Sequence, residues 1–362
     1  IADTSYEFFY RVNYAQNWQE FKSSLKFHVA PAINIIYADV ENNIALVGAG
    51  KIPIRRQGKG YLPTIGGEKE DQWQGYVPAL SMPIDLNPPA GFVVNANNAN
   101  ADATYPYFIS NDFAQEFRAK RISDLLEQKI SSQTYVDIKD MQQIQADLLD
   151  LSQTQLREFL VKSEGQSATE KQALQHLMSW DGRASMSSTG ATVYYTWLRH
   201  LKRLIFADEL RGSWNLTDEN RQLMSIVNGI SSKKLVEVLK GASQWCDDVT
   251  TETAEGCEFQ LQKGLSLTVK ELIKLAGNAV VDWQWGNVQF TEYRHQPFSQ
   301  NKFLGQFFER KIGNGGAPNT VNVAVSSFDE SLGYRQFFGA GFRQIFQLST
   351  GTDASVFMNS TG

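Results

Sequence analysis

The chain has 362 residues, of which 42% are hydrophobic and 12% aromatic, enough to bury the core of one large or two ordinary domains. Its net charge of -5 comes from 34 basic and 39 acidic residues without a long run of either sign, so nothing supports a nucleic-acid-binding surface. No stretch approaches about 18 consecutive apolar residues, and we expect no membrane span. The start, IADTSYEFFY, is neither a signal peptide nor an initiator methionine, so we expect that a preceding segment has been removed.

Residues 1–109 are predicted to form the first part of a sheet core with irregular active-site loops. INIIYADV and NIALVGAG are two β-branched runs, and the turn Glu41–Asn43 between them predicts a hairpin. Farther on, GFVVNANNAN at residues 91–100 places several neutral amides after an apolar strand. Such a run usually forms a solvated loop. The alternative is that one amide NH2 donates to a negative charge that develops on a substrate oxygen.

Residues 110–279 have helical periodicity and are predicted to form a helical insertion. Residues 110–112, Ser-Asn-Asp, are candidate caps for a helix that contains Phe113 and Phe117. GATVYYTWLRHLKRLIFADEL predicts a long buried helix, and SLTVKELIKLAG predicts a helix that ends at a glycine. Strand patterns return in residues 280–362. The order β, α, β predicts an α+β fold in which helices interrupt one sheet core.

Two cysteines, Cys246 and Cys257, flank a polar, acidic loop. Their spacing allows a disulfide, and the alternative is a pair of free thiols. A polar loop is a poor place to keep reduced cysteines buried, which favours the disulfide and an oxidising compartment.

The sequence lacks a self-contained catalytic motif. The four histidines have no metal-ligand spacing, so no metal site is predicted, and His200 beside Lys202 and Arg203 is expected at the surface. Neither a G-x-S-x-G elbow nor a phosphate loop occurs. Residue patterns alone therefore indicate a soluble α+β protein.

A series of short segments resembles the penicillin acylase family in order and spacing. In residues 17–56 a helix is followed by Asn34, then by Tyr37, Ala38 and Asp39, a turn and a second strand. The similarity continues through LP at 62–63, WQGYVP at 73–78, NPPAG at 87–91, NANN at 95–98, YPY at 105–107, RAKRI at 118–122, WDG at 180–182, WG at 285–286, GG at 315–316 and TVN at 320–322.

This resemblance implies part of the four-layer αββα sandwich of N-terminal-nucleophile hydrolases, carrying a helical insertion. Family members are exported to the periplasm and cut themselves into α and β chains. The new N-terminal residue of the β chain attacks the amide of a small N-acyl compound, of the penicillin or acyl-homoserine lactone type. Its own α-amino group, with an unperturbed pKa of about 8, serves as the base, so no histidine is required.

The resemblance also assigns candidate site residues. Asn97 falls at the family's oxyanion-hole asparagine, and such a donor contributes on the order of 3 kcal/mol. Arg118 falls at an arginine near the nucleophile; the alternative is a helix-surface arginine paired with Glu116 or Asp112. Asn95 and Asn98 are expected to hold the loop around Asn97.

The matched region corresponds to the central and C-terminal part of a family β chain, so the nucleophile is expected upstream and the isolated chain is expected to be inactive. The α chain and the N-terminal part of the β chain are the expected partners. No cofactor is required, and the full protein allows a structural calcium ion. The alternative function is a non-catalytic binding or scaffold protein that kept this fold without the nucleophile.

Overall fold

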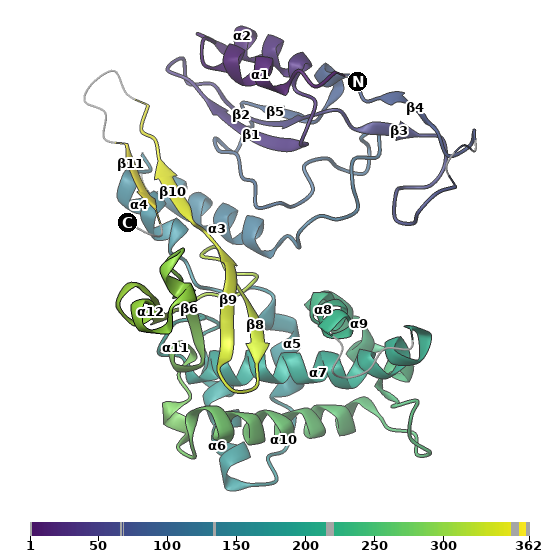
Figure 1. The fold of residues 1–362 in the computed structure, drawn as a ribbon, viewed down its shortest axis with the longest axis vertical. Helices are drawn as coiled ribbons and strands as arrows, with labels where there is room; N and C mark the ends of the chain where they lie inside the picture. The colour runs from purple at the N-terminus through teal and green to yellow at the C-terminus, as the bar shows by residue number, and fades with distance from the viewer. Residues whose placement is uncertain are drawn as a thin grey trace. The chain divides into compact units, whose positions relative to one another are not determined.

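The structure, a computed structural model, describes residues 2–65, 67, 69–132, 135–214, 221–348 and 355–359. The chain forms two compact units (Figure 1). The first unit comprises Ile1–Met141 and Gln344–Phe357, and the second comprises Gln142–Arg343 and Met358–Gly362. This division follows spatial contacts, whereas the three parts expected from the sequence follow secondary-structure type, so those boundaries remain a prediction.

The first unit contains a three-stranded antiparallel sheet in the order β1-β2-β5, formed by β1 (Ile33–Ala38), β2 (Ile44–Ala49) and β5 (Ile84–Leu86). β1 and β2 pair as the predicted hairpin, with Ala38 opposite Ile44. Asp39 closes the turn, because its carboxylate accepts hydrogen bonds from Tyr37 Oη and from the backbone amides of Glu41 and Asn43. These contacts explain why a short polar turn can fix the register of two apolar strands.

Two helices and a 3₁₀ turn pack on this sheet: α1 (Ser5–Val12), α2 (Trp18–Ser24) and η1 (Leu25–Phe27). Their buried side chains Phe8, Phe21 and Leu25 meet Ala45 and Val47 of β2. Asn17 caps α2 by accepting a hydrogen bond from the backbone amide of Glu20. The apolar residues of β2 are thus covered by the N-terminal helices.

The remaining elements of the first unit lead to the candidate site. A second hairpin joins β3 (Pro53–Arg55) and β4 (Trp73–Tyr76), and η2 (Ala79–Ser81) precedes β5. After a long irregular segment come α3 (Phe117–Ser132) and α4 (Ile138–Gln145), and the first segment of this unit ends within α4 at Met141. The expectation that Phe113 belongs to the helix is wrong. The backbone amide of Ala114 donates to the carbonyl of Asn97, so this segment is bound to the asparagine loop before the helix begins.

The second unit is built around α7 (Thr189–Trp214), the predicted long buried helix. Its neighbours are α5 (Gln153–Leu160), α6 (Ala168–Met178), α8 (Arg221–Gly229), α9 (Ser232–Lys240), η3 (Ser243–Cys246), α10 (Cys257–Ala276), η4 (Val280–Asp282) and α11 (Trp285–Val288). α10 passes close to α7 at Gly264, where a Cβ atom would lie 2.8 Å from Nε1 of Trp197. The same indole nitrogen donates to the carbonyl of Leu261 at 3.1 Å. α10 ends at Gly277, as its sequence predicts.

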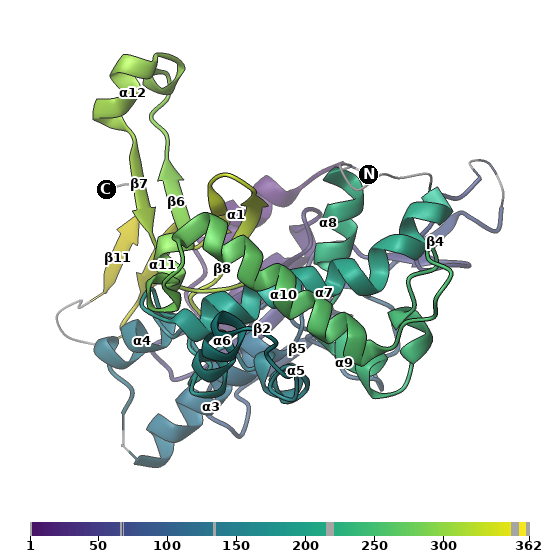
Figure 2. The same ribbon diagram turned by 90° about the horizontal axis from the view of Figure 1, so that it is seen from below.

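A four-stranded sheet of order β7-β6-β9-β8 completes the second unit. Its strands are β6 (Gln289–Tyr293), β7 (Arg310–Gly313), β8 (Ala324–Asp329) and β9 (Gly333–Gly339), and β6 runs parallel to β9. Between β6 and β7 lie η5 (Phe298–Gln300) and α12 (Lys302–Phe308), which Figure 2 shows at the far end of the ribbon formed by β6 and β7. A separate pair joins β10 (Phe342–Ile345) and β11 (Val356–Asn359).

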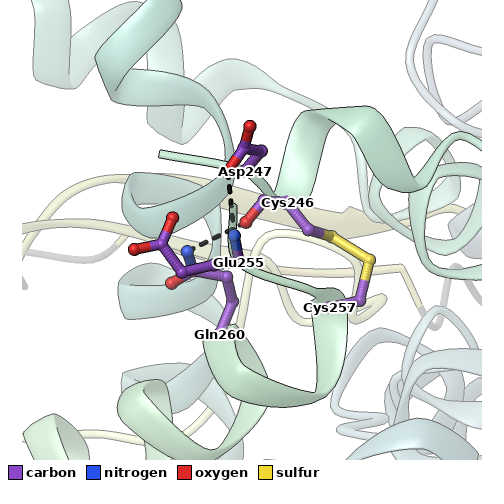
Figure 3. Close-up of a disulfide and its surroundings, with 5 residues drawn as sticks. All are labelled: Cys246, Asp247, Glu255, Cys257 and Gln260. Carbon is purple, nitrogen blue, oxygen red and sulfur yellow. Dashed lines mark hydrogen bonds between the residues drawn. A yellow bond between two sulfur atoms is a disulfide. The ribbon is translucent and has the colours of Figure 1, made fainter. Parts of the chain in front are cut away.

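A disulfide links Cys246, at the end of η3, to Cys257, at the start of α10 (Figure 3). Gln260 donates to the carbonyl of Cys246, and the backbone amide of Glu255 donates to the carboxylate of Asp247. The loop that the two cysteines close is therefore tied to the helix that follows it.

Candidate functional site

The candidate site lies on the irregular segment that follows β5 in the first unit. Asn87 and Gly91 turn the chain away from the sheet, with φ values of 51° and 76° in the left-handed region. Farther along, Nδ2 of Asn100 donates to Oδ1 of Asn34 on β1 at 2.7 Å. The asparagine run thus lies against the sheet edge at one end, and Asn100, which the sequence did not single out, provides that attachment.

Asn97 is held in a left-handed backbone conformation, with φ of 65°. Its backbone amide donates to Oδ1 of Asn95 at 3.3 Å, and its carbonyl accepts from the amide of Ala114 at 2.9 Å. Asn98 supports the preceding residue, because its Oδ1 accepts from the amide of Ala96 at 3.0 Å. Side-chain and backbone groups together therefore fix a conformation that L-residues rarely adopt.

Arg118, in the first turn of α3, fixes the side chain of Asn97. Its Nη2 donates to the carbonyl of Ala96 at 2.6 Å and to Oδ1 of Asn97 at 3.0 Å. The structure therefore brings Arg118 to the asparagine loop, and these contacts replace the alternative pairing with Glu116 or Asp112. Burial lowers the pKa of Arg118 from its ordinary value, but a guanidinium stays protonated at neutral pH.

The orientation of the Asn97 amide follows from this contact. With Oδ1 engaged by Arg118, the NH2 group must point elsewhere, and Nδ2 of Asn97 makes no hydrogen bond to any residue that the structure describes. Asn97 is exposed. The loop thus presents a fixed, accessible donor, which is the arrangement that stabilises charge on an oxygen. The amide of Ala114 and the carbonyl of Ala96, which support this loop, are backbone groups. The amino-acid sequence therefore could not identify them as part of the site.

His200 lies outside this site, and its expected surface position is wrong. It is 8% exposed, and its Nε2 lies 3.2 Å from a carboxylate oxygen of Glu271 on α10. Burial lowers the pKa of His200. Arg199, on the same helix, also pairs with Glu271, so this part of α7 contributes to an internal ion pair instead of a solvated face.

No group of three or more His, Cys, Asp or Glu residues capable of holding a metal ion occurs among the residues that the structure describes. The structural calcium ion that the resemblance allows in the full protein stays a prediction, and no chemistry is assigned to it. Within the same residues, no helix is long and apolar enough to cross a membrane.

Comparison with known proteins decides the family. The penicillin amidase family profile matches residues 2–362. The chain belongs to this family. An acyl-homoserine lactone acylase, QuiP, from Pseudomonas syringae is 27% identical over 96% of the chain and 43% of its own length. A penicillin acylase 2 proenzyme from a Pseudomonas species is 31% identical over 48% of the chain and 22% of its own length.

A solved structure supports the fold of this family member. The thermostable penicillin G acylase from Alcaligenes faecalis superposes with a TM-score of 0.58 at 19% identity, covering 86% of this chain and 60% of that chain. The predicted α+β class, as part of an N-terminal-nucleophile hydrolase fold, is confirmed. The chain spans less than half the length of the curated relatives that it matches.

Proposed function

We propose that the complete protein is an exported, periplasmic amidohydrolase that cleaves the amide bond of small N-acyl compounds. Membership of the penicillin amidase family supports the reaction class. The names of the relatives support substrates of the penicillin or acyl-homoserine lactone type. The single observation that carries the proposal for this chain is the exposed Nδ2 of Asn97, fixed by Arg118 and the loop.

The proposed reaction uses a nucleophilic hydroxyl at the N-terminus of a β chain, supplied by a segment outside residues 1–362. The hydroxyl oxygen bonds to the amide carbon while its proton passes to the α-amino base, and the carbonyl electron pair moves to oxygen. Nδ2 of Asn97 would donate to that oxyanion. As the intermediate collapses, the α-ammonium group returns that proton to the amide nitrogen, the C–N bond breaks and the amine leaves. Water then hydrolyses the acyl-enzyme, which releases the carboxylic acid and restores the hydroxyl.

Arg118 would act through Asn97 as a positioning residue. A free asparagine amide can present either oxygen or nitrogen to the substrate, and only the nitrogen donates. By donating to Oδ1, Arg118 selects the orientation in which nitrogen faces outward. Autoproteolytic processing, and association with an α chain and the N-terminal part of the β chain, belong to the same proposal, which requires no cofactor.

The test is turnover by the complete protein with Asn97 replaced by Ala and, separately, by Gly. Glycine tolerates the left-handed backbone at no steric cost, so Asn97→Gly removes the amide without adding strain. We expect both variants to lose about 100-fold to 1000-fold in kcat and to remain folded. Asn42→Ala is the matched control, since Asn42 has φ of 66°, is exposed and lies in the hairpin turn.

Normal turnover in Asn97→Gly would remove Asn97 from the mechanism. A complete protein that hydrolyses no N-acyl compound would instead favour the non-catalytic binding or scaffold function.

A further inference from the structure

The arm that β6 and β7 form carries an exposed aromatic surface at its end. We call residues 294–311 the arm tip; it contains η5 and α12. Figure 2 shows α12 away from α7, α10 and α11 within the second unit. Phe303 and Phe307 are 67% and 60% exposed, and their ring centroids lie 5.3 Å apart. Because they are four residues apart on α12, both lie on one face of the helix.

The arm tip has a second aromatic cluster of its own. The rings of Phe298 and Phe308 lie 4.6 Å apart, and His295 stacks on Phe298 at 4.7 Å. Asn301 caps α12 by accepting from the backbone amides of Phe303 and Leu304. The tip can therefore hold its shape while Phe303 and Phe307 remain outside its own packing.

Charge distinguishes the arm tip from the rest of the chain. Its basic residues are Arg294, Lys302, Arg310 and Lys311, against the single acidic residue Glu309, while the whole chain carries a net charge of -5. Arg294 is paired with Glu292 of β6 at 3.1 Å, so the excess positive charge rests on Lys302, Arg310 and Lys311. All four basic residues are exposed. Arg310 also donates to the carbonyl of Phe307, which keeps its charge beside the aromatic face.

We propose that the arm tip binds an anionic lipid surface by inserting Phe303 and Phe307 between the head groups. Exposed aromatic side chains flanked by Lys and Arg are the combination that binds at membrane interfaces. Anionic head groups attract the basic residues, whereas the net negative charge of residues 1–362 is repelled, so this chain would approach with the arm tip first. This inference does not depend on the proposed amidase activity.

A second exposed aromatic pair shows what the charge contributes. Tyr10 and Tyr14 are 60% and 64% exposed, four residues apart, with ring centroids 4.9 Å apart. Their surroundings include Glu7 and Glu20, and Arg11 is paired with Glu7. This pair has matching exposed aromatic surface without an excess of positive charge, so we assign it no lipid contact.

The test is sedimentation of the complete protein with vesicles of phosphatidylcholine alone and of phosphatidylcholine with phosphatidylglycerol. We expect binding to the anionic vesicles only, weakened by salt. The double variant Phe303→Ser, Phe307→Ser should reduce it at least about tenfold. Tyr10→Ser, Tyr14→Ser is the matched control and should bind as the unaltered protein does. Thermal unfolding checks that each variant is folded.

Three results would overturn the inference. The first is equal sedimentation of the Phe303, Phe307 double variant and the unaltered protein, and the second is no sedimentation of either. The third is protection of a Phe303→Cys side chain from a water-soluble maleimide in the complete protein without vesicles, since another part of the protein would then cover the arm tip.

Discussion

Each of the two units contains a polar network, and the two networks differ in whether their last polar group is buried or exposed. In the second unit, Asp150 is fully buried and accepts hydrogen bonds from Ser152 and from Tyr195 Oη. In the first unit, the contacts among Asn95, Asn97 and Arg118 end at an exposed amide nitrogen. A network whose buried carboxyl group is surrounded by donors specifies packing, whereas a network that leaves a fixed donor at the surface can bind a ligand.

This difference predicts that the second unit governs stability and the asparagine loop governs turnover. Substitutions in the two places should therefore change different measurements. A substitution in the α7 core should have the largest effect, and the loss of the Asp150 titration should have the smallest.

Trp197→Ala should have the largest effect. The indole is fully buried between α7 and α10, so its loss leaves a cavity and removes its hydrogen bond to the carbonyl of Leu261. We expect the free energy of unfolding of the complete protein to fall by about 4 kcal/mol, with kcat of the folded fraction unchanged. Chemical denaturation measures the free energy of unfolding, and kinetic assays below the unfolding transition measure kcat. Trp73→Ala, at a 56% exposed position, is the control.

Removing the disulfide should have the next effect. Cys246→Ser with Cys257→Ser opens the acidic loop and frees the start of α10. Loop-closure entropy for a loop of this length predicts a loss of about 3 kcal/mol of stability. Denaturation of the double variant, compared with the unaltered protein in reductant, checks this value. A double variant as stable as the oxidised protein would show that the loop is held by its hydrogen bonds alone.

Arg118→Ala should lower turnover rather than stability. The variant loses a charged donor to Oδ1 of Asn97, so the amide can rotate. We expect kcat to fall by about 30-fold, which corresponds to about 2 kcal/mol, with KM nearly constant. Arg118→Lys retains the charge but not the planar fork, and should recover only part of the loss. A change confined to the melting temperature would assign Arg118 to the fold alone.

Asp150→Asn should have the smallest effect, visible as a change in pH dependence. Burial raises the pKa of Asp150, although hydrogen bonds from Ser152 and Tyr195 oppose the shift. The folded state then holds its proton above the unfolded pKa of about 3.9, so stability falls as pH rises from there toward the folded pKa. The variant lacks this titration, so as the pH rises above about 4 the unaltered protein should lose more stability than the variant does. Denaturation at a series of pH values measures both slopes, and equal slopes would contradict the raised pKa.

The sequence predicted the features that depend on local chemistry. The β1–β2 hairpin follows from its polar turn, which Asp39 stabilises, and α10 ends where Gly277 adopts a left-handed conformation. Asn97 and Arg118 were singled out by family resemblance, and the structure adds the hydrogen bonds between them.

Features that depend on partners distant in the sequence were not predictable. The start of α3 is displaced because Ala114 bonds to Asn97, and His200 is buried because Glu271 lies across from it on α10. Neither partner is visible in the local pattern. The same holds for the attachment of Asn100 to Asn34, which joins positions separated by 66 residues.

The most direct test of the account is a double-mutant cycle between Asn97→Ala and Arg118→Ala, measured as kcat/KM for amide hydrolysis by the complete protein. If Arg118 acts by orienting the Asn97 amide, Arg118→Ala should cost about 30-fold in the unaltered background and less than about threefold once Asn97 is alanine. The same fold-loss in both backgrounds would show that Arg118 contributes independently, and would contradict the proposed role of the pair.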